Sequence, residues 1–301
     1  MTNTSAADSG GDDQQALRRL HADHARAWRQ FDYVYPVVSR RSRGLSIGVN
    51  VNVDTACNFD CVYCQVDRTQ PPRRRDVDLD QLASELRAMI EHVVSGRIWK
   101  EPDLAGTPIE LRRLNDIAFS GDGEPTAFPG FEQAVAIAAD LRQQFTLSTT
   151  NLVLITNATL LDRPPVMRGL ARLDGNGGQI WAKLDAGTDE YFRQVDRPRG
   201  GLSLERITAN ITAAARRRPI VIQTMLMRMA GQPMSDTEFQ RYLDRLASVI
   251  DAGGVIAQVQ LYTVVRQPAE DGVDPLTREQ LDAYADRLRR RLPSVHCMTY
   301  G

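Results

Sequence analysis

Hydrophobic and polar positions follow two different periods along this chain, and short apolar runs of strand length recur from residue 45 onward. Runs of this length, bounded by turn residues, are typical of buried β-strands. The predicted strands are Leu45–Val53, Asp116–Ser120, Asn151–Thr156, Gln179–Leu184, Ile220–Leu226 and Val255–Val265.

Helical patterns lie between these strands. Asp80–Val94 places its apolar residues on one face, and two capping boxes, Ser235/Glu238 and Thr277/Gln280, precede later helices. Other predicted helices are Phe131–Phe145, Pro165–Leu173 and Ser203–Arg217. The alternation predicts βαβ units and a parallel sheet, either doubly wound or closed into a barrel. In both arrangements functional groups gather at the carboxyl ends of the strands.

The N-terminal segment differs from the rest. Residues 1–12 are rich in Ser, Gly and Asp, and we expect a disordered tail. Residues 13–44 are predicted to form a helical extension, because apolar residues recur among charges in its first half. Residues 45–301 are then one α/β domain that ends with a C-terminal helix.

Composition narrows the class of protein. The 301 residues include 42% hydrophobic residues, too many for a mostly disordered chain, and four cysteines are too few for a disulfide scaffold. No apolar run approaches the roughly 20 residues that span a bilayer. The polar, acidic N-terminus does not resemble a secretory signal, so we expect a cytoplasmic protein without a membrane partner. A formal charge of −1 gives no reason to expect a nucleic-acid binder.

Three of the four cysteines, Cys57, Cys61 and Cys64, follow the first predicted strand with the spacing C-x3-C-x2-C. Three thiolates can hold three corners of an iron–sulfur cubane and leave the fourth iron without a protein ligand, which is where chemistry can take place. A structural zinc site is an alternative, but it needs a fourth ligand, and Cys297 lies far along the chain. The other alternative is three inert core cysteines.

This cysteine spacing, with Tyr63 just before the third cysteine, resembles the signature of radical S-adenosylmethionine (SAM) enzymes. The resemblance implies a [4Fe–4S] cluster held by Cys57, Cys61 and Cys64, with SAM chelating the open iron and Tyr63 near the adenine. The implied fold is a partial (β/α)6 barrel, and the six strand–helix units counted above agree with it. The implied reaction is reductive cleavage of SAM to a 5′-deoxyadenosyl radical that abstracts hydrogen from a substrate.

A glycine-rich turn, Phe119-Ser-Gly-Asp-Gly-Glu-Pro-Thr126, ends the second predicted strand. Gly121 and Gly123 allow close backbone approach, and Glu124 adds a carboxylate. Alone, this would be an ordinary turn. The radical SAM resemblance implies that the turn corresponds to the Gly-Gly-Glu-type motif that binds the SAM amino group.

Polar residues on later strands are further candidates for the site. Asn157, at the end of the third predicted strand, can contact SAM or simply terminate the strand. Strand alternation places Lys183 and Asp185 on one face, where they can pair with each other as a structural ion pair or contact SAM. Lys183 is also a candidate catalytic residue, since it can bind a substrate carboxylate or form a Schiff base. Candidates with a barrel-lining position are Gln223, which we assign to the cofactor site, and Gln258, Gln260, Tyr262 and Val264–Arg266.

Taken together, the motifs are similar to those of the Fe–S oxidoreductases related to wyosine-forming tRNA enzymes, which build a tricyclic base on a tRNA guanosine using pyruvate. Those tRNA enzymes carry a second cysteine-held cluster with lysines near it, whereas this chain has no second cysteine set and only Lys100 and Lys183. The resemblance therefore implies the SAM machinery and not the wyosine reaction.

The implied partners are a one-electron reductant, such as flavodoxin or ferredoxin, and an unidentified substrate. A small molecule is favoured because no RNA or peptide recognition domain is visible, although RNA and peptide substrates stay open. Wyosine-type tRNA modification and a non-enzymatic iron–sulfur or zinc protein are the alternative functions.

Overall fold

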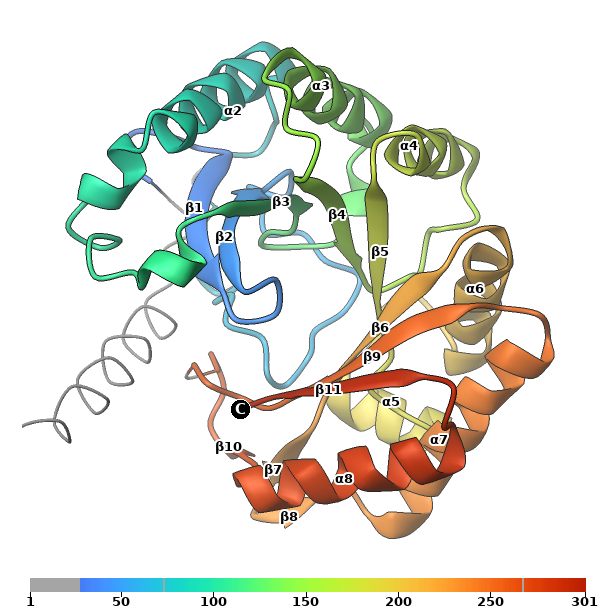
Figure 1. Ribbon diagram of the computed structural model, residues 1–301. Helices are drawn as coiled ribbons and strands as arrows, with labels where there is room; N and C mark the ends of the chain where they lie inside the picture. The colour runs from blue at the N-terminus through green and yellow to red at the C-terminus, as the bar shows by residue number, and fades with distance from the viewer. Residues whose placement is uncertain (1–27, 73, 267) are drawn as a thin grey trace, which may run out of the picture.

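The computed structural model describes residues 28–72, 74–266 and 268–301, and its main sheet is curled and covered by helices on its outer side (Figure 1). In spatial order the eight strands are β1 (Val34–Ser39), β2 (Gly44–Val49), β3 (Leu114–Phe119), β4 (Asn151–Thr156), β5 (Gly178–Lys183), β6 (Ile220–Met225), β9 (Ile256–Tyr262) and β11 (His296–Tyr300). All neighbouring strands are parallel except β1, which pairs antiparallel with β2.

The helices connect successive strands across the outer face, as right-handed βαβ crossovers require. They are α2 (Leu79–Val94), α3 (Phe131–Gln144), α4 (Pro164–Asp174), α5 (Asp189–Val195), α6 (Leu204–Arg217), α7 (Asp236–Asp251) and α8 (Arg278–Arg291). Short 3-10 turns are η1 (Arg97–Lys100), η2 (Ile109–Leu111) and η3 (Pro125–Ala127). A small second sheet has the order β10 (Val273–Pro275), β7 (Met227–Met229) and β8 (Gln232–Pro233).

The predicted partial barrel is confirmed, with six predicted strands corresponding to β2, β3, β4, β5, β6 and β9. Of the two predicted capping boxes, one is confirmed in full and the other in part. Thr277 and Gln280 form the expected capping box. Ser235 caps α7, but the Glu238 carboxylate accepts hydrogen bonds from Gly187 and Thr188 instead of from its own cap residue.

The predicted helical extension over residues 13–44 is wrong for its second half. Residues 1–27, which include the predicted tail, lie outside the described part of the chain. Val34–Ser39 is the edge strand β1, whose Val34 and Tyr35 are buried. Pro36 does not prevent this, because an edge strand need not use every N–H in the ladder. Pairing with β2 buries the apolar residues of this segment, and this burial stabilises a strand over a helix.

The two faces of the sheet bury different side chains. The outer face packs Ile47, Ile117 and Leu154 against helix residues such as Leu86 in the main core. Inside the barrel the apolar cluster is small, consisting of Ala118, Val153, Trp181 and Val221. The interior therefore leaves room for polar side chains and a cavity.

The two sheet edges meet through the turn between β1 and β2. Arg40 Nη1 donates to the Gly301 main-chain oxygen at 3.2 Å, and the Tyr300 hydroxyl donates to the Arg41 carbonyl at 3.5 Å. These contacts bridge the open side of the barrel without a strand ladder between β1 and β11. Among the described helices, none has the length and apolar character needed to cross a lipid bilayer.

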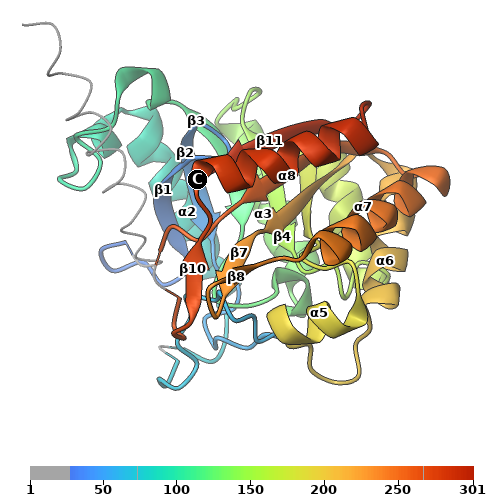
Figure 2. The ribbon, with the colours of Figure 1, turned by 90° about the horizontal axis from the view of Figure 1, so that it is seen from below.

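The loops at the carboxyl ends of the strands gather on one side, together with α5 and the small sheet (Figure 2). An apolar cluster joins them: Val62 and Tyr63 pack with Val195, Met227 and Val264. The cysteine loop is thereby held at the rim of the barrel, where a parallel sheet is expected to place its functional groups.

Candidate active site

The cysteine loop leaves β2 and is held in place by the segment that follows α5. Val62 N–H donates to the Val195 carbonyl at 2.9 Å and Asp60 N–H to the Asp196 carbonyl at 3.1 Å. In the opposite direction, Arg199 N–H donates to the Asn58 carbonyl at 2.9 Å. These main-chain hydrogen bonds fix the path of the loop independently of its side chains.

The three cysteines of this loop are free thiols, half-buried, and line one cavity of about 300 Å³ inside the barrel. Burial raises the pKa of Cys57, and it raises that of Cys61 well above the usual range, with the nearby Asp196 acting in the same direction. In the described part of the chain, no three His, Cys, Asp or Glu side chains converge on one point as the ligands of a single ion would. Each cysteine of a cubane binds a different iron, so a cluster does not require three thiols to converge on one point.

The glycine-rich turn packs directly on the cysteine loop and on the end of β2. A Cβ on Gly123 would lie 2.0 Å from the Ala56 carbonyl oxygen, and one on Gly121 would lie 2.1 Å from Asn50 Oδ1. Both distances are far below contact, so glycine is required at these positions by loop packing alone. Both glycines also line the cavity.

Glu124 is buried and organises the ends of two elements. Its Oε1 accepts hydrogen bonds from Thr126 N–H at 3.1 Å, from the Thr126 hydroxyl and from the Thr156 hydroxyl at 2.6 Å. Among the described residues its Oε2 accepts only the Asn157 N–H, at 2.7 Å, and so keeps capacity for one more donor. Burial raises the pKa of Glu124 against the opposing effect of these donors. The carboxylate therefore joins the glycine-rich turn to the end of β4.

Arg68 joins the same loops from the other side. Its Nε donates to the Thr55 carbonyl at 3.1 Å and its Nη2 to the Asp122 carbonyl at 3.2 Å. Its Nη1 lies 3.3 Å from Cys64 Sγ. One guanidinium thus spans the cysteine loop, the glycine-rich turn and a predicted cluster ligand, which only a planar group with several fixed donors can do.

Lys183 and Asp185 lie on the same face of β5 and its extension, as strand alternation predicts, with Nζ and Oδ2 3.6 Å apart. Lys183 also donates to the Tyr262 hydroxyl at 2.8 Å and lies 4.5 Å from the centre of the Tyr63 ring. Burial alone would lower the pKa of Lys183, but the neighbouring Asp185 and Tyr262 outweigh it and raise the pKa. The amine therefore stays protonated, which favours a cationic role over Schiff-base formation.

The Tyr63 hydroxyl points into a carboxylate pair below the cysteine loop. It donates to Asp185 Oδ2 at 2.5 Å and lies 3.3 Å from Asp196 Oδ1, which in turn is 3.5 Å from Cys61 Sγ. Burial, and then the charge of Asp185, raise the pKa of Asp196 well above its usual range. Tyr63 lines the cavity with its ring while its hydroxyl serves this buried network.

Asn157 and Gln223 both line the cavity but differ in their partners. The Asn157 amide donates to Asn58 in the cysteine loop, and its oxygen accepts from the N–H and hydroxyl of Thr159, so its side chain ties β4 to that loop. Gln223 Nε2 donates to Gln260, whereas its Oε1 is buried without a hydrogen-bond partner among the described residues. A buried orphan acceptor at a cavity wall is a position that a bound ligand can satisfy.

The structure thus gathers every predicted site residue except Asp185, Gln258 and Gln260 at the wall of one cavity. Asp185 lies directly behind Tyr63 and Lys183, whereas Gln260 lies behind Gln223 and is hydrogen-bonded to Gln258. Tyr262 and Val264–Arg266 reach the same wall. Cys297 does not: it is buried beside α8 in the outer core, and Lys100 is exposed.

Three residues that belong to the site were missed from the sequence. Arg68 follows Cys64 by four residues, and its charge beside a metal-binding motif was a usable signal. Asp196 and Arg41 carried no such signal, because only the fold brings the segment after α5 to the cysteine loop and the β1–β2 turn to this cavity.

Comparisons with known proteins agree with this geometry. A family profile described as the Radical SAM superfamily matches residues 51–246, well over half of the chain. A UPF0026 protein of Synechocystis sp. is 26% identical over 223 residues, covering 73% of this chain and 72% of the relative.

Two solved structures share the fold. A radical SAM methyltransferase from Sphaerobacter thermophilus superposes with a TM-score of 0.60 at 15% identity, over 89% of this chain and 68% of the other. TYW1 with a lysine-pyruvate adduct bound superposes with a TM-score of 0.52 at 16% identity, over 83% and 74% respectively. At such identities the likeness is one of fold.

Proposed function

This chain belongs to the radical SAM superfamily and is an enzyme of that class, and we propose that Cys57, Cys61 and Cys64 hold a [4Fe–4S] cluster whose open iron binds SAM. The observation that carries the proposal is that all three thiols are free of disulfide bonds, line one cavity and lie beside a glycine-rich turn. When bound and reduced, such a cluster supplies the electron that cleaves SAM to methionine and a 5′-deoxyadenosyl radical, which removes a hydrogen atom from the substrate.

The residues around the cavity fit this cofactor pair. Arg68 places a cationic hydrogen-bond donor 3.3 Å from Cys64 Sγ, where it can contact the sulfur of an iron ligand. Glu124 Oε2 and Gln223 Oε1 are buried acceptors with spare capacity, as a ligand with an ammonium group and hydroxyls requires. Gly121 and Gly123 leave no side chain between the turn and the cavity.

Water exclusion is the second contribution of the protein. The thiols lie inside a curled sheet whose open side is bridged by the Arg40–Gly301 and Tyr300–Arg41 contacts. A reactive radical survives only where solvent and competing hydrogen donors are kept away. We further propose that a flavodoxin or ferredoxin supplies the electron and that the substrate is a small molecule placed inside the barrel, without the wyosine reaction on tRNA.

Cluster loading tests the ligand assignment. The full-length protein is reconstituted anaerobically with iron and sulfide, and iron, sulfide and zinc are determined. Cys61→Ala is expected to lose the loaded cluster, whereas the matched control Cys297→Ala keeps it, because Cys297 lies in the outer core. Equal loading of both variants would refute the assignment.

Product analysis tests the chemistry. The loaded protein with SAM and a chemical reductant is expected to form 5′-deoxyadenosine, measured by chromatography and mass spectrometry. A fully loaded protein that leaves SAM intact would contradict the proposed function.

A further inference from the structure

Arg41 brings a second cationic group into the barrel from outside the sheet. It belongs to the β1–β2 turn, and its main chain is held by the Tyr300 hydroxyl. Its Cζ lies 5.6 Å from the centre of the Trp181 ring and 5.4 Å from that of Tyr262, and the side chain lines the cavity. The guanidinium is thus positioned by two aromatic rings rather than by a carboxylate.

The charge of Arg41 is not neutralised within the described residues. No ion pair or hydrogen bond joins its guanidinium to any of them, although most other buried or half-buried cations of this chain have such a partner. Its charge acts on Asp116, which lines the same cavity and whose carboxylate already accepts a hydrogen bond from Ser46. A cation–π contact uses no N–H donor, so the planar fork of Arg41 is free to bind an oxyanion.

Lys183 contacts the same aromatic ring as Arg41. Its Nζ is 5.5 Å from the same Tyr262 ring centre, and it is also beside Tyr63 and therefore beside the cysteine loop. Arg41 also contacts Trp181, which lies two residues before Lys183 on β5. Both cations therefore line the cavity that the three cysteines also line.

From this geometry we infer that the cavity binds a small substrate with a carboxylate or phosphate group, and that Arg41 holds this oxyanion. The inference rests on the proposed function, since it names the substrate class of the same site. Guanidinium and oxyanion can form two parallel charge-assisted hydrogen bonds, which fix orientation as well as position. The substrate must be small because the turn that carries Arg41 also bridges the open side of the barrel.

The test is anion binding by the reconstituted holoenzyme, measured by calorimetry with inorganic phosphate and with succinate at constant ionic strength. The wild type is expected to bind at least one of them saturably. Arg41→Gln is expected to weaken that binding about tenfold or more, as the loss of a charge-assisted pair requires. Arg41→Lys, which keeps the charge but not the fork, should fall in between.

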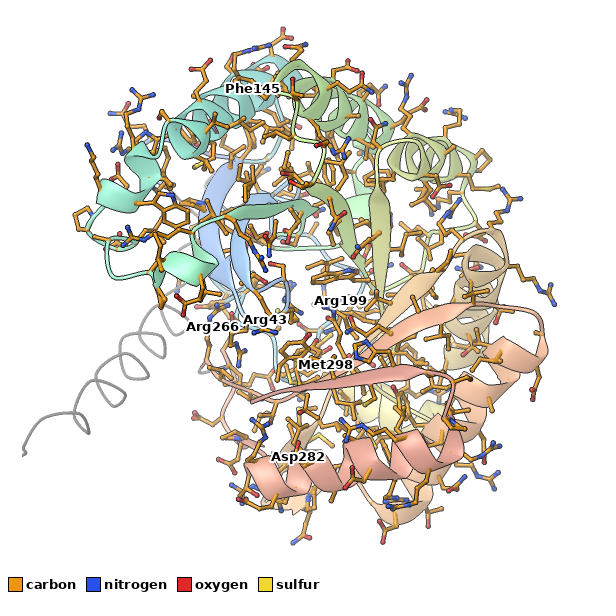
Figure 3. The ribbon with its side chains drawn as sticks, viewed as in Figure 1. Arg43, Phe145, Arg199, Arg266, Asp282 and Met298 are labelled. Atoms are coloured by element: carbon orange, nitrogen blue, oxygen red, sulfur yellow. The ribbon has the colours of Figure 1, made fainter. Side chains whose placement is uncertain are left out.

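Arg43→Gln is the matched control. Arg43 lies in the same turn and is labelled in Figure 3, but it is exposed and does not line the cavity. Its binding constants should stay within about twofold of the wild type, as expected for a surface substitution. Equal binding by Arg41→Gln and Arg43→Gln, or no saturable binding by the wild type, would overturn the inference.

Titration with SAM distinguishes a substrate oxyanion from the carboxylate of SAM itself. If Arg41→Gln weakens SAM binding as much as it weakens binding of the probe, Arg41 holds the SAM carboxylate and the inference is wrong. The proposed function fails separately, through absence of 5′-deoxyadenosine in the wild type, which leaves Arg41-dependent anion binding as a distinct observation.

Discussion

Replacing Glu124 by Gln should destabilise the protein even without any cofactor. Gln can keep one acceptor oxygen for the Thr126 and Thr156 donors, but its amide nitrogen then faces the Asn157 N–H, a donor against a donor. One buried charge-assisted hydrogen bond is lost and one buried N–H is left unpaired. We expect a loss of about 2–3 kcal/mol in the free energy of unfolding.

For a chain of this size that loss corresponds to a decrease of about 3–5 °C in the melting temperature. Differential scanning fluorimetry of the cofactor-free protein measures it directly. Glu124→Ala removes the acceptor of all four hydrogen bonds and should cost more. The matched control is Glu110→Gln, because Glu110 is exposed, and its effect should stay within about 0.5 kcal/mol.

The alternative for Glu124 is a carboxylate kept free for SAM. In that case Glu124→Gln would leave the melting temperature of the cofactor-free protein unchanged and would weaken only SAM binding. That result would refute the structural role assigned here to Oε2 and to its hydrogen bond from the Asn157 N–H.

Three further substitutions test other parts of the account. Gly123→Ala should lower both the melting temperature and the iron content after reconstitution, because its Cβ would lie 2.0 Å from the Ala56 carbonyl oxygen and the two loops must separate; unchanged loading would contradict this. Arg68→Lys should lower iron content at nearly unchanged secondary structure by circular dichroism, since an ammonium cannot span the three acceptors that include Cys64; normal loading would show that the span is dispensable. Burial raises the pKa of Cys297 from 9.0 to about 11, so the neutral thiol stabilises the fold and this contribution is lost as pH rises from about 9 through 11. Chemical denaturation across that range should therefore show the wild type losing stability relative to Cys297→Ala, and parallel pH profiles would contradict the assignment.

The fold was predictable where local pattern and tertiary environment agree. Asn151–Thr156 is a short apolar run between helical segments, and β4 has the same bounds. β1 was missed because Pro36 and the neighbouring charges obscure its pattern, and its stability comes from pairing with β2. α5 and β11 are short, and contacts distant in sequence hold them in place.

The candidate site also has a part that the sequence predicted and a part that it did not. The cysteine spacing and the Gly-Asp-Gly-Glu turn are local signals, so their place at the carboxyl ends of β2 and β3 followed from the sequence. The partners of these residues did not. Glu124 bonds to Thr156 and Asn157, and Tyr63 bonds to Asp185, only because the curled sheet brings separate strand ends together.

The most direct test of the central claim is electron paramagnetic resonance of the reduced, reconstituted protein with and without SAM. A cluster held by three cysteines with one open iron should give a [4Fe–4S] signal that shifts when SAM is added. A well-loaded cluster whose spectrum is the same with and without SAM would contradict the account.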